Sequence, residues 1–463
     1  MFCSCGKRSV TQGHPTTRHI TDFLGTIFLT SCSLLSFTQD VVGQSQDSSA
    51  SRGTFGIVDT VVVTGNRKTK DYVILDEMTL QPGLVATQEI IEYDRNRIYS
   101  LGLFNRVDIW CEPSDDQLLL RIDVSERWYI IPLPVFGFAD GDPKKPFYGG
   151  GVLHNNFRGR NQKIFGLITF GYNPSLSLSF RDPQIDRDNG LSFSGSFSFA
   201  RIRNKSVREA SLTGDFNEMH YNINATIGKR FNIHETLGMN TGFQIVHIKE
   251  YRPGRTVSPD GADAFLFAGL SYVFDSRDLR EYAMTGGYVF LGVTKLGFGE
   301  SPLSFTRFNI DARRYIPVFG DLTIASRLHG TIVSGTTIPT YARAYFGYGE
   351  RIRGYFRTVL EGEDLAGASL EVRYMIFEPR TFMMNALPLP AEFSEWRFGI
   401  ALALFVDSGV AWFRGEELRL SDFSSGYGAG IDFLLPYSFV VRTEYAWNEL
   451  SVGQFIVDFR ASF

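Results

Sequence analysis

Two short segments combine charged residues and glycines in a way that predicts a buried ion pair. Residues 351–356 (RIRGYF) hold two arginines beside Gly354, and residues 405–409 (FVDSG) hold one acid, Asp407. The Arg353 guanidinium is a planar fork of donors that suits a carboxylate, and glycine permits the tight bend that presents it. Burial would oblige the two groups to pair, because an unpaired buried charge is costly. The alternative is a charged loop in solvent.

The elements that would position these groups are short strands. From about residue 147 the apolar and polar residues alternate, as in residues 193–199 (FSGSFSF) and 457–463 (VDFRASF). Such alternation turns Phe toward lipid and Ser toward the lumen of a membrane β-barrel, and tilted strands of 9–11 residues cross a bilayer. We predict about 16 antiparallel strands, beginning near Tyr148, Gln162, Ser175, Gly190, Val207, Met219, Leu237, Asp263, Gly286, Leu303, Asp321, Gly367, Trp396, Gly426, Tyr437 and Gly453.

Composition agrees with a barrel and excludes some other classes of protein. The chain has 463 residues, 43% of them hydrophobic, with 46 Gly, 41 Phe and 20 Tyr. No run of 18 apolar residues predicts a transmembrane helix. The net charge of -4 gives no indication of nucleic-acid binding. A soluble β-sandwich remains the alternative, although its two outer faces would need solvating over an unusually large number of strands.

The N-terminal part is predicted to contain three units. Residues 1–43 have the features of a signal peptide, with an apolar run over 20–37 and a small-residue cleavage site at 41–43. Residues 29–32 (LTSC) offer a lipoprotein site as the alternative. Residues 44–56 form a polar linker, and residues 57–130 form a compact α+β domain ahead of a barrel over 131–463.

The small domain is predicted to have the order β-α-α-β-β. A strand over 57–65 precedes a helix over 71–80, and a second helix begins after Thr87 as N-cap. Two strands, 106–112 and 117–126, complete it. Only Cys111 lies outside the leader, so a disulfide framework is excluded for the mature monomer. It is interpreted as a small apolar strand residue, with a reactive thiol as the alternative.

The chain after the leader resembles the BamA/TamA superfamily of outer-membrane assembly and translocation barrels (bacterial surface antigens), with one POTRA domain before a barrel. Residues 99–107 (YSLGLFNRV) resemble the helix-to-strand passage of a POTRA domain. The barrel resemblance is carried, in chain order, by residues 155–159 (NNFRG), 180–183 (FRDP), 275–278 (DSRD), 285–287 (TGG), 351–356, 405–409 and the terminal Phe463. Each motif is weak alone, and their order makes the set specific.

The resemblance implies a loop that folds back into the lumen. Its RGF-type tip corresponds to Arg353, Gly354 and Tyr355, with Tyr in place of the usual Phe, and Asp407 and Glu371 correspond to its acidic partners. We therefore expect a latch between the loop and the barrel wall.

The resemblance also implies a closing seam between the first and last strands. We expect it between the strand of Gly149, Gly150 and Gly151 and the strand that ends at Phe463. Glycines weaken strand pairing, so this seam could open and template an incoming strand. The alternative is that these glycines only relieve crowding at the rim of the barrel. The resemblance also implies that Phe463 is the recognition mark by which this barrel is itself inserted. Anchoring in the aromatic girdle is the alternative for Phe463, and both roles can hold together.

The expected function is a non-enzymatic factor that assembles or inserts outer-membrane β-barrel proteins, or translocates polypeptides. The alternative is a passive pore or scaffold. No catalytic set, cofactor or metal site is indicated, because the seven histidines are scattered. Asp275, Arg277 and Asp278 could suggest a Ca²⁺ site, but the resemblance implies a network of ion pairs in the lumen. The implied partners are membrane lipids, unfolded β-barrel clients and periplasmic chaperones or assembly lipoproteins. The implied location is the bacterial outer membrane with the POTRA domain in the periplasm, and the mitochondrial outer membrane is the alternative.

Overall fold

The computed structural model describes residues 53–114, 117–139, 143–299, 301–335, 337–384 and 391–458. The predicted signal peptide, most of the linker and Phe463 lie outside these ranges. Among the described residues, no helix is both long and apolar enough to cross a membrane.

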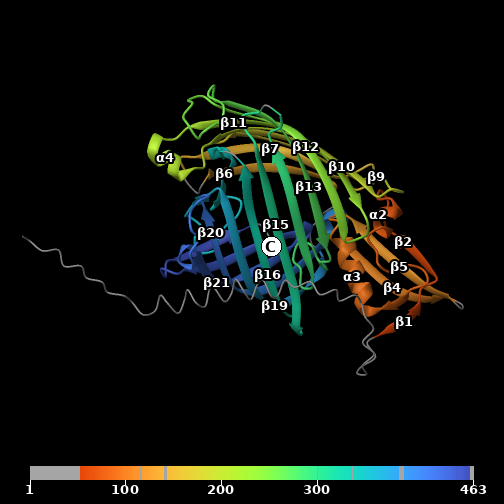
Figure 1. Cartoon of the computed structure of the whole chain (residues 1–463). Coiled ribbons are helices and arrows are strands. Elements are labelled where there is room, and N and C mark those ends of the chain that lie inside the picture. The colour runs from red at the N-terminus through yellow and green to blue at the C-terminus, as the bar shows by residue number, and fades with distance from the viewer. Residues whose placement is uncertain are drawn as a thin grey trace, which may run out of the picture.

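One antiparallel sheet of sixteen strands dominates the structure and curls into a barrel (Figure 1). Its strands follow chain order without a crossover, and β6 and β23 lie at its two ends. The strands are β6 (Ile130–Phe138), β7 (Pro146–Phe157), β8 (Gln162–Gly171), β9 (Ser175–Asp186), β10 (Leu191–Arg203), β11 (Asn217–Arg230), β12 (Glu235–Ile248), β13 (Ala262–Asp275), β14 (Gly286–Leu296), β15 (Phe305–Phe319), β16 (Leu322–Gly335), β19 (Asp364–Met383), β20 (Glu395–Trp412), β21 (Ser424–Leu435), β22 (Phe439–Asn448) and β23 (Gly453–Asp458). The predicted fold class is confirmed.

Alternating exposure gives this sheet an apolar outer face. In β11, the exposed side chains of Tyr221, Ile223 and Ile227 alternate with Asn222 and Asn224. Asn224 donates a hydrogen bond to Ser196 Oγ on β10 at 2.9 Å, inside the barrel. Exposed apolar side chains on every second position are the pattern of a lipid-facing wall.

A small α+β domain precedes the barrel and lies at one end of its strands (Figure 1). Its sheet has the order β2 (Thr60–Thr64), β5 (Gln117–Glu126) and β4 (Phe104–Ser114), with β5 central; β1 (Thr54–Ile57) pairs separately with β3 (Val85–Thr87). The helices are α2 (Asp71–Leu75) and α3 (Gln88–Tyr99). Thr87 caps α3 as predicted, by accepting a hydrogen bond from the Ile90 N–H. The first helix is shorter than the predicted 71–80.

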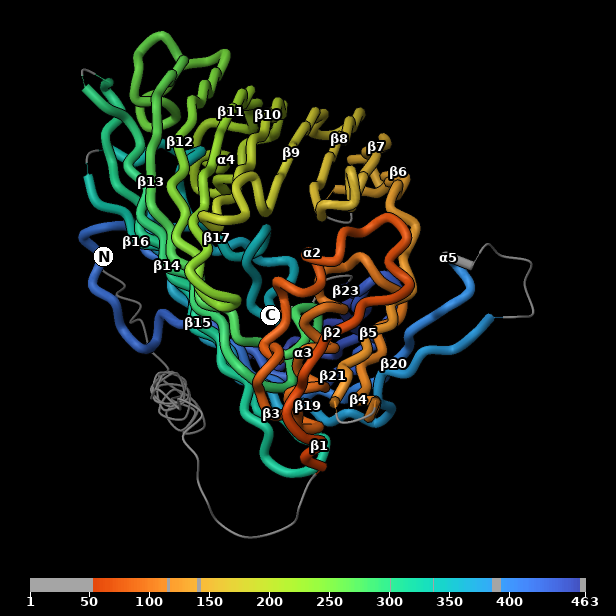
Figure 2. The backbone as a smooth tube through the Cα atoms, turned by 90° about the vertical axis from the view of Figure 1, so that its right-hand side faces the viewer, coloured from red at the N-terminus to blue at the C-terminus, as the bar shows by residue number. Residues whose placement is uncertain are grey.

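The core of this domain continues into the barrel. Ile74, Ile98 and Leu120 are fully buried, and they belong to one apolar cluster with Tyr282 and Met375 of the barrel. Figure 2 shows the domain in front of the arc formed by β6–β12 and beside the ends of the later strands. The domain is therefore packed against the barrel.

One predicted strand is wrong and one strand of the sheet was not predicted, so the two errors cancel in the count. The segment predicted to begin a strand at Val207 is the helix α4 (Val207–Thr213), whose N-cap Ser206 accepts a hydrogen bond from the Glu209 N–H at 3.0 Å. Ser followed three residues later by Glu is a capping-box signal. The first strand of the sheet is β6, which was not predicted because its sequence, IIPLPVFGF, does not alternate and contains two prolines.

Short elements occupy the connections. They are η2 (Thr340–Ala342), β17 (Ala344–Phe346) and β18 (Leu360–Gly362) between β16 and β19, α5 (Ala391–Ser394) before β20, η3 (Leu420–Asp422) before β21 and η4 (Pro436–Ser438) before β22. β17 pairs with β18, so these two strands form a hairpin within the long connection, and residues 347–359 between them carry Arg353.

Candidate functional site

The long connection between β16 and β19 brings Arg353 against the inner wall of the barrel. Arg353 donates to Asp407 of β20 from Nε at 2.7 Å, from Nη2 at 2.7 Å and from its backbone N–H at 3.0 Å. Nη1 donates to Glu371 of β19 at 2.6 Å and to Glu444 of β22 at 3.1 Å. The guanidinium lies 3.7 Å from the centre of the Phe405 ring. One buried side chain thus joins the loop to three strands.

Two further arginines extend this site into a buried charge cluster. Arg373 Nε donates to Glu371 at 2.7 Å. Arg442 Nη1 lies 3.4 Å from Glu371 and 3.9 Å from Glu444, and its Nε lies 3.8 Å from Asp432. All five of these residues are nearly inaccessible to solvent. With Arg353 and Asp407, the cluster holds three arginines and four acids, and every acid in it has an arginine nitrogen within 4.0 Å.

Gly354 lets the loop approach the wall closely enough to make these contacts. Its φ is +95°, and a Cβ at this position would lie 2.7 Å from the carbonyl oxygen of Trp447. In strand β21 of the barrel wall, a Cβ on Gly426 would lie 1.7 Å from the carbonyl oxygen of Arg353. Both positions therefore require glycine, because any side chain would push the loop away.

Residues after Gly354 attach the loop to the last hairpin of the sheet. The Tyr355 hydroxyl donates to Glu449, in the turn between β22 and β23. The Phe356 N–H donates to Gln454 Oε1, on β23, at 2.9 Å. Tyr355, the departure from the usual Phe, thus adds a contact that Phe cannot make.

A turn of the barrel that lies beside the N-terminal domain also contacts the buried charge cluster. Residues 276–285 connect β13 and β14, and the buried Tyr282 donates from Oη to Asp432 at 2.8 Å. Arg373 Nη1 donates to the Ala283 carbonyl at 2.9 Å, with its guanidinium 4.6 Å from the Tyr282 ring centre. In the same turn region, Arg277 Nε pairs with Asp275 at 2.8 Å, as the ion-pair interpretation expects.

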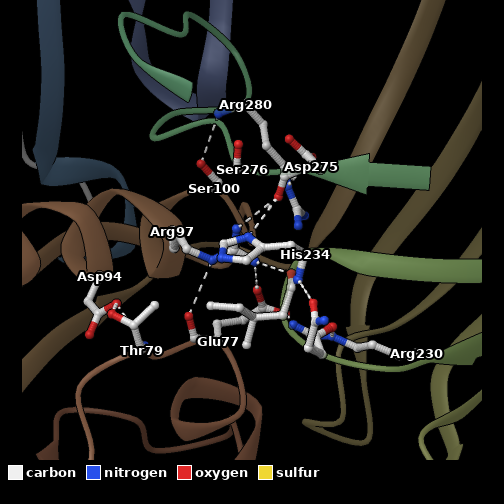
Figure 3. A network of polar contacts seen from close by, with 12 residues as sticks. Glu77, Thr79, Asp94, Arg97, Ser100, Arg230, His234, Asp275, Ser276 and Arg280 are labelled. Atoms are coloured by element: carbon white, nitrogen blue, oxygen red, sulfur yellow. Dashed lines mark hydrogen bonds and ion pairs between the residues drawn. The ribbon is translucent and has the colours of Figure 1, made fainter. Parts of the chain in front are cut away.

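A second polar network joins the N-terminal domain to the barrel (Figure 3). Arg97 of α3 pairs with Glu77 at 2.8 Å, and it donates to the carbonyl oxygens of Ile233 at 2.8 Å and Asp275 at 3.4 Å. Arg230 of β11 pairs with the other oxygen of Glu77 at 2.9 Å. Glu77 is therefore held between an arginine of its own domain and one of the barrel.

The titration of two groups at this junction is shifted by their surroundings. Burial by itself would raise the pKa of Glu77, but Arg230, Arg280 and Arg97 hold that pKa below its usual value. Burial lowers the pKa of His234, which lies in the turn between β11 and β12 with its Nδ1 3.1 Å from the Asp275 carbonyl oxygen. The docked arrangement thus favours a charged Glu77 and a neutral His234.

The NNFRG segment (155–159), which begins in β7, also connects the barrel to the N-terminal domain. Asn155 Nδ2 donates to the Gly102 carbonyl at 2.9 Å, and Asn156 Nδ2 donates to Thr69 Oγ1 at 2.9 Å. The Gly159 carbonyl accepts from the Lys70 N–H at 2.9 Å. This motif therefore fixes the N-terminal domain to the barrel.

The predicted seam was assigned to the wrong strand. Gly149, Gly150 and Gly151 lie in β7, which pairs on one side with β6 and on the other with β8. The first edge is instead β6, and the last described strand, β23, pairs only with β22. No ladder joins β6 to β23 within the described residues, and Phe463 lies beyond them.

Sequence reasoning placed Arg353, Gly354, Tyr355, Asp407 and Glu371 together, and the structure brings them together. It missed Glu444, Arg442, Asp432, Arg373 and Tyr282. A signal was present for the strand residues: charges two apart in otherwise apolar strands, as in RTE (442–444) and EVR (371–373), share one face. Cys111 lies half-buried on β4, and burial raises the pKa of its thiol, which favours the structural interpretation.

Comparisons with known proteins agree with this architecture. Residues 156–455 match the Omp85 superfamily domain, and residues 57–127 match the POTRA family described as surface antigen variable number repeat. The outer membrane protein assembly factor BamA of Nitratidesulfovibrio vulgaris is 23% identical over 392 residues, which cover 79% of this chain and 45% of that relative. The chain thus spans less than half the length of that protein. BamA from Haemophilus ducreyi lacking POTRA domains 1–3 has a similar fold, with a TM-score of 0.51 at 14% identity over 88% of this chain and 84% of that one.

Proposed function

Because the chain belongs to the Omp85 superfamily, we propose that it promotes the folding and insertion of β-barrel proteins in the bacterial outer membrane. In this proposal the sheet spans the membrane and the POTRA domain lies in the periplasm. The partners are membrane lipids, unfolded β-barrel clients and, upstream of insertion, periplasmic chaperones or assembly lipoproteins.

The observation that carries the proposal is the pair of sheet ends, β6 and β23, which no ladder joins in the described part of the chain. A free strand edge presents unpaired N–H and C=O groups, and an extended segment can satisfy them by β-augmentation. In a bilayer this pairing is strongly favoured, because lipid offers no other hydrogen-bond partner. Insertion would need no nucleotide and no catalytic residue.

The Arg353 loop is assigned the role of a latch in this mechanism. It connects the wall strands β19, β20 and β22 through Arg353 and reaches β23 through Phe356. Because the loop contacts both the wall strands and β23, it holds the β22–β23 hairpin in place from inside the barrel. The edge of β23 that faces away from β22 remains available for pairing. The latch thus keeps one edge of the seam in place while a client strand docks.

The proposal is tested with lipid vesicles that contain the purified protein and a urea-unfolded β-barrel client. We expect the client to fold faster than in empty vesicles, measured by its heat-modifiable migration on gels. A passive pore would instead give ion conductance without faster client folding. A cysteine pair that links β6 to β23 supplies an internal control: folding should stop in the oxidised form and resume on reduction.

A further inference from the structure

The β19–β20 hairpin continues past its neighbours at the end of the barrel beside the POTRA domain. The ladder between β16 and β19 ends at Tyr374, and the ladder between β21 and β20 ends at Gly399. Beyond these positions, in the part of the chain that the structure describes, β19 and β20 pair only with each other. We call this two-stranded segment, residues 376–383 and 395–398, the arm.

Two irregularities in the pairing bend the arm. The register of β19 against β20 shifts between Met375 and Phe377, and again between Phe377 and Arg380. Extra residues in one strand form β-bulges, which bend the strand that carries them. In Figure 2 the hairpin runs out to the right, with α5 near its tip, beyond the outline of the barrel strands. A strand that bends outward turns its lipid-side face toward the membrane surface and its lumen-side face away from the membrane.

One face of the arm is aromatic and carries a single arginine. Residues that lie directly opposite each other share a face of the sheet. The opposed pairs on this face are Phe377 with Ile400, Arg380 with Phe398, and Phe382 with Trp396. Phe382 and Trp396 are 43% and 41% exposed. Along β20, the face continues into the lipid-facing wall through the exposed Leu402 and Leu404, because all these β20 side chains occupy every second position.

The opposite face of the arm is polar and contacts the POTRA domain. Arg397, which lies opposite Thr381, has its guanidinium 4.1 Å from the centre of the Tyr99 ring at the end of α3. Glu395 accepts a hydrogen bond from Arg106 Nε of β4 at 3.3 Å. The arm therefore has its polar face on the POTRA domain, and its aromatic face points away from that domain.

The composition of the aromatic face fits a membrane surface. A two-stranded hairpin is at best marginally stable in water, and a contiguous exposed apolar face marks a binding surface. Aromatic rings are enriched at the level of the lipid headgroups, and arginine beside them reaches the headgroup phosphates. Arg380 suits that contact, with its guanidinium 5.9 Å from the centre of the Phe377 ring. Continuity with the lipid-facing wall places this face next to the bilayer.

We propose that the arm lies on the periplasmic surface of the bilayer and connects it to the POTRA domain, an inference that rests on the membrane placement proposed above. The aromatic face, with Phe382 and Trp396, enters the headgroup layer of the phospholipids. The polar face holds the POTRA domain through Tyr99 and Arg106. Contact with lipid thus helps to fix the orientation of the POTRA domain relative to the membrane.

Spin labels on single cysteines test the lipid contact. The chain, with its four native cysteines replaced by alanine, is reconstituted in vesicles of phosphatidylcholine and phosphatidylglycerol. Each label is exposed to O2, which concentrates in lipid, and to a water-soluble nickel chelate. We expect O2 to dominate the collisions at Phe382→Cys and at Leu404→Cys on the wall, and the chelate to dominate at Thr381→Cys. Trp396→Cys serves as a second probe of the aromatic face if Phe382→Cys does not fold.

The three labels separate failure of this inference from failure of the proposed function. If the chelate dominates at Leu404→Cys, the sheet does not span the membrane, and both proposals fall. If O2 dominates at Leu404→Cys but the chelate dominates at Phe382→Cys, only the inference is overturned, because the aromatic face then meets water or a soluble partner. Dominance of O2 at Thr381→Cys would also contradict the inference, because the arm would then have no polar side.

Removal of the aromatic face tests the connection to the POTRA domain. In vesicles, Phe382→Ser with Trp396→Ser should speed hydrogen exchange in β4 about fivefold, because an arm released from the bilayer holds Arg106 less firmly. Leu212→Ser is the matched control, since Leu212 is 72% exposed on α4, at the opposite end of the barrel (Figure 1). The control should leave exchange in β4 unchanged. Equal exchange in the double variant and the parent chain would contradict the inference.

Discussion

Replacing Arg353 by alanine should destabilise the barrel far more than an ordinary loop substitution does. The change removes four side-chain hydrogen bonds, two to Asp407 and one each to Glu371 and Glu444. Glu371 would keep Arg373 at 2.7 Å. Within the described residues, Asp407 would keep only the backbone N–H of residue 353.

The cost therefore falls mainly on Asp407. Removing one partner of a buried ion pair commonly costs about 3–5 kcal/mol, because the remaining charge is uncompensated. We expect a loss of that size in the free energy of unfolding. Adding Asp407→Asn to Arg353→Ala removes the orphaned charge and should recover about 1–3 kcal/mol.

The assay is urea unfolding in lipid vesicles, followed by tryptophan fluorescence and by heat-modifiable migration. Arg351→Ala is the control from the same loop: Arg351 is exposed, its Nε donates to the Tyr348 carbonyl oxygen at 3.2 Å, and its guanidinium lies over the Phe356 ring. This change should cost about 1 kcal/mol or less. Equal losses for Arg351→Ala and Arg353→Ala would refute the latch, as would a double variant no more stable than Arg353→Ala.

Three other predictions concern the loop tip and the domain junction. Gly354→Ala should lower stability more than Gly415→Ala, measured in the same unfolding assay, because both have a positive φ but only Gly354 faces a carbonyl oxygen within 3 Å. Arg97→Gln should loosen the POTRA domain, seen as faster hydrogen exchange in α3 with the barrel strands unchanged; unchanged exchange in α3 would contradict the role of this arginine. Lowering the pH should also loosen the domain. The pKa of His234 is depressed, so the stability that His234 contributes to docking is complete above about pH 6.5 and falls as the pH drops below that value. The pKa of Glu77 is also depressed, so the stability that Glu77 contributes persists until the pH falls below 4.5. Hydrogen exchange in α3 at pH 5.5 and 7.5, corrected for intrinsic rates, checks this order.

Local patterns in the sequence were sufficient for most strands. Alternation in segments such as 193–199 depends only on which side chains meet lipid, and that is a property of neighbours along the chain. Alternation failed at Val207, where a capping signal was overlooked, and at β6, where prolines and two apolar faces hide the strand. The N-terminal domain was predicted for the same local reasons, through Thr87 as a helix cap and the paired runs that became β4 and β5.

The candidate site was only partly predictable. Arg353 and Asp407 are 54 residues apart, and it was the family resemblance that joined them with Glu371. Glu444, Arg442 and Asp432 were missed because their meeting depends on the register of β21 against β22, where Asp432 faces Arg442. Register follows from the whole sheet, since a slip of one residue would turn these charges to the lipid. The contact of Tyr282 with Asp432 depends on how a turn enters the barrel, which no short-range pattern encodes.

By itself, the sequence determined that this chain forms a lipid-facing sheet behind a small α+β domain, because side-chain polarity at every second position decides which face meets the bilayer. Only the tertiary structure decided which strands end the sheet and which charges share the buried cluster. Those features depend on hydrogen bonds between strands, and the partner in such a bond is chosen by the closure of the entire sheet and not by adjacent residues.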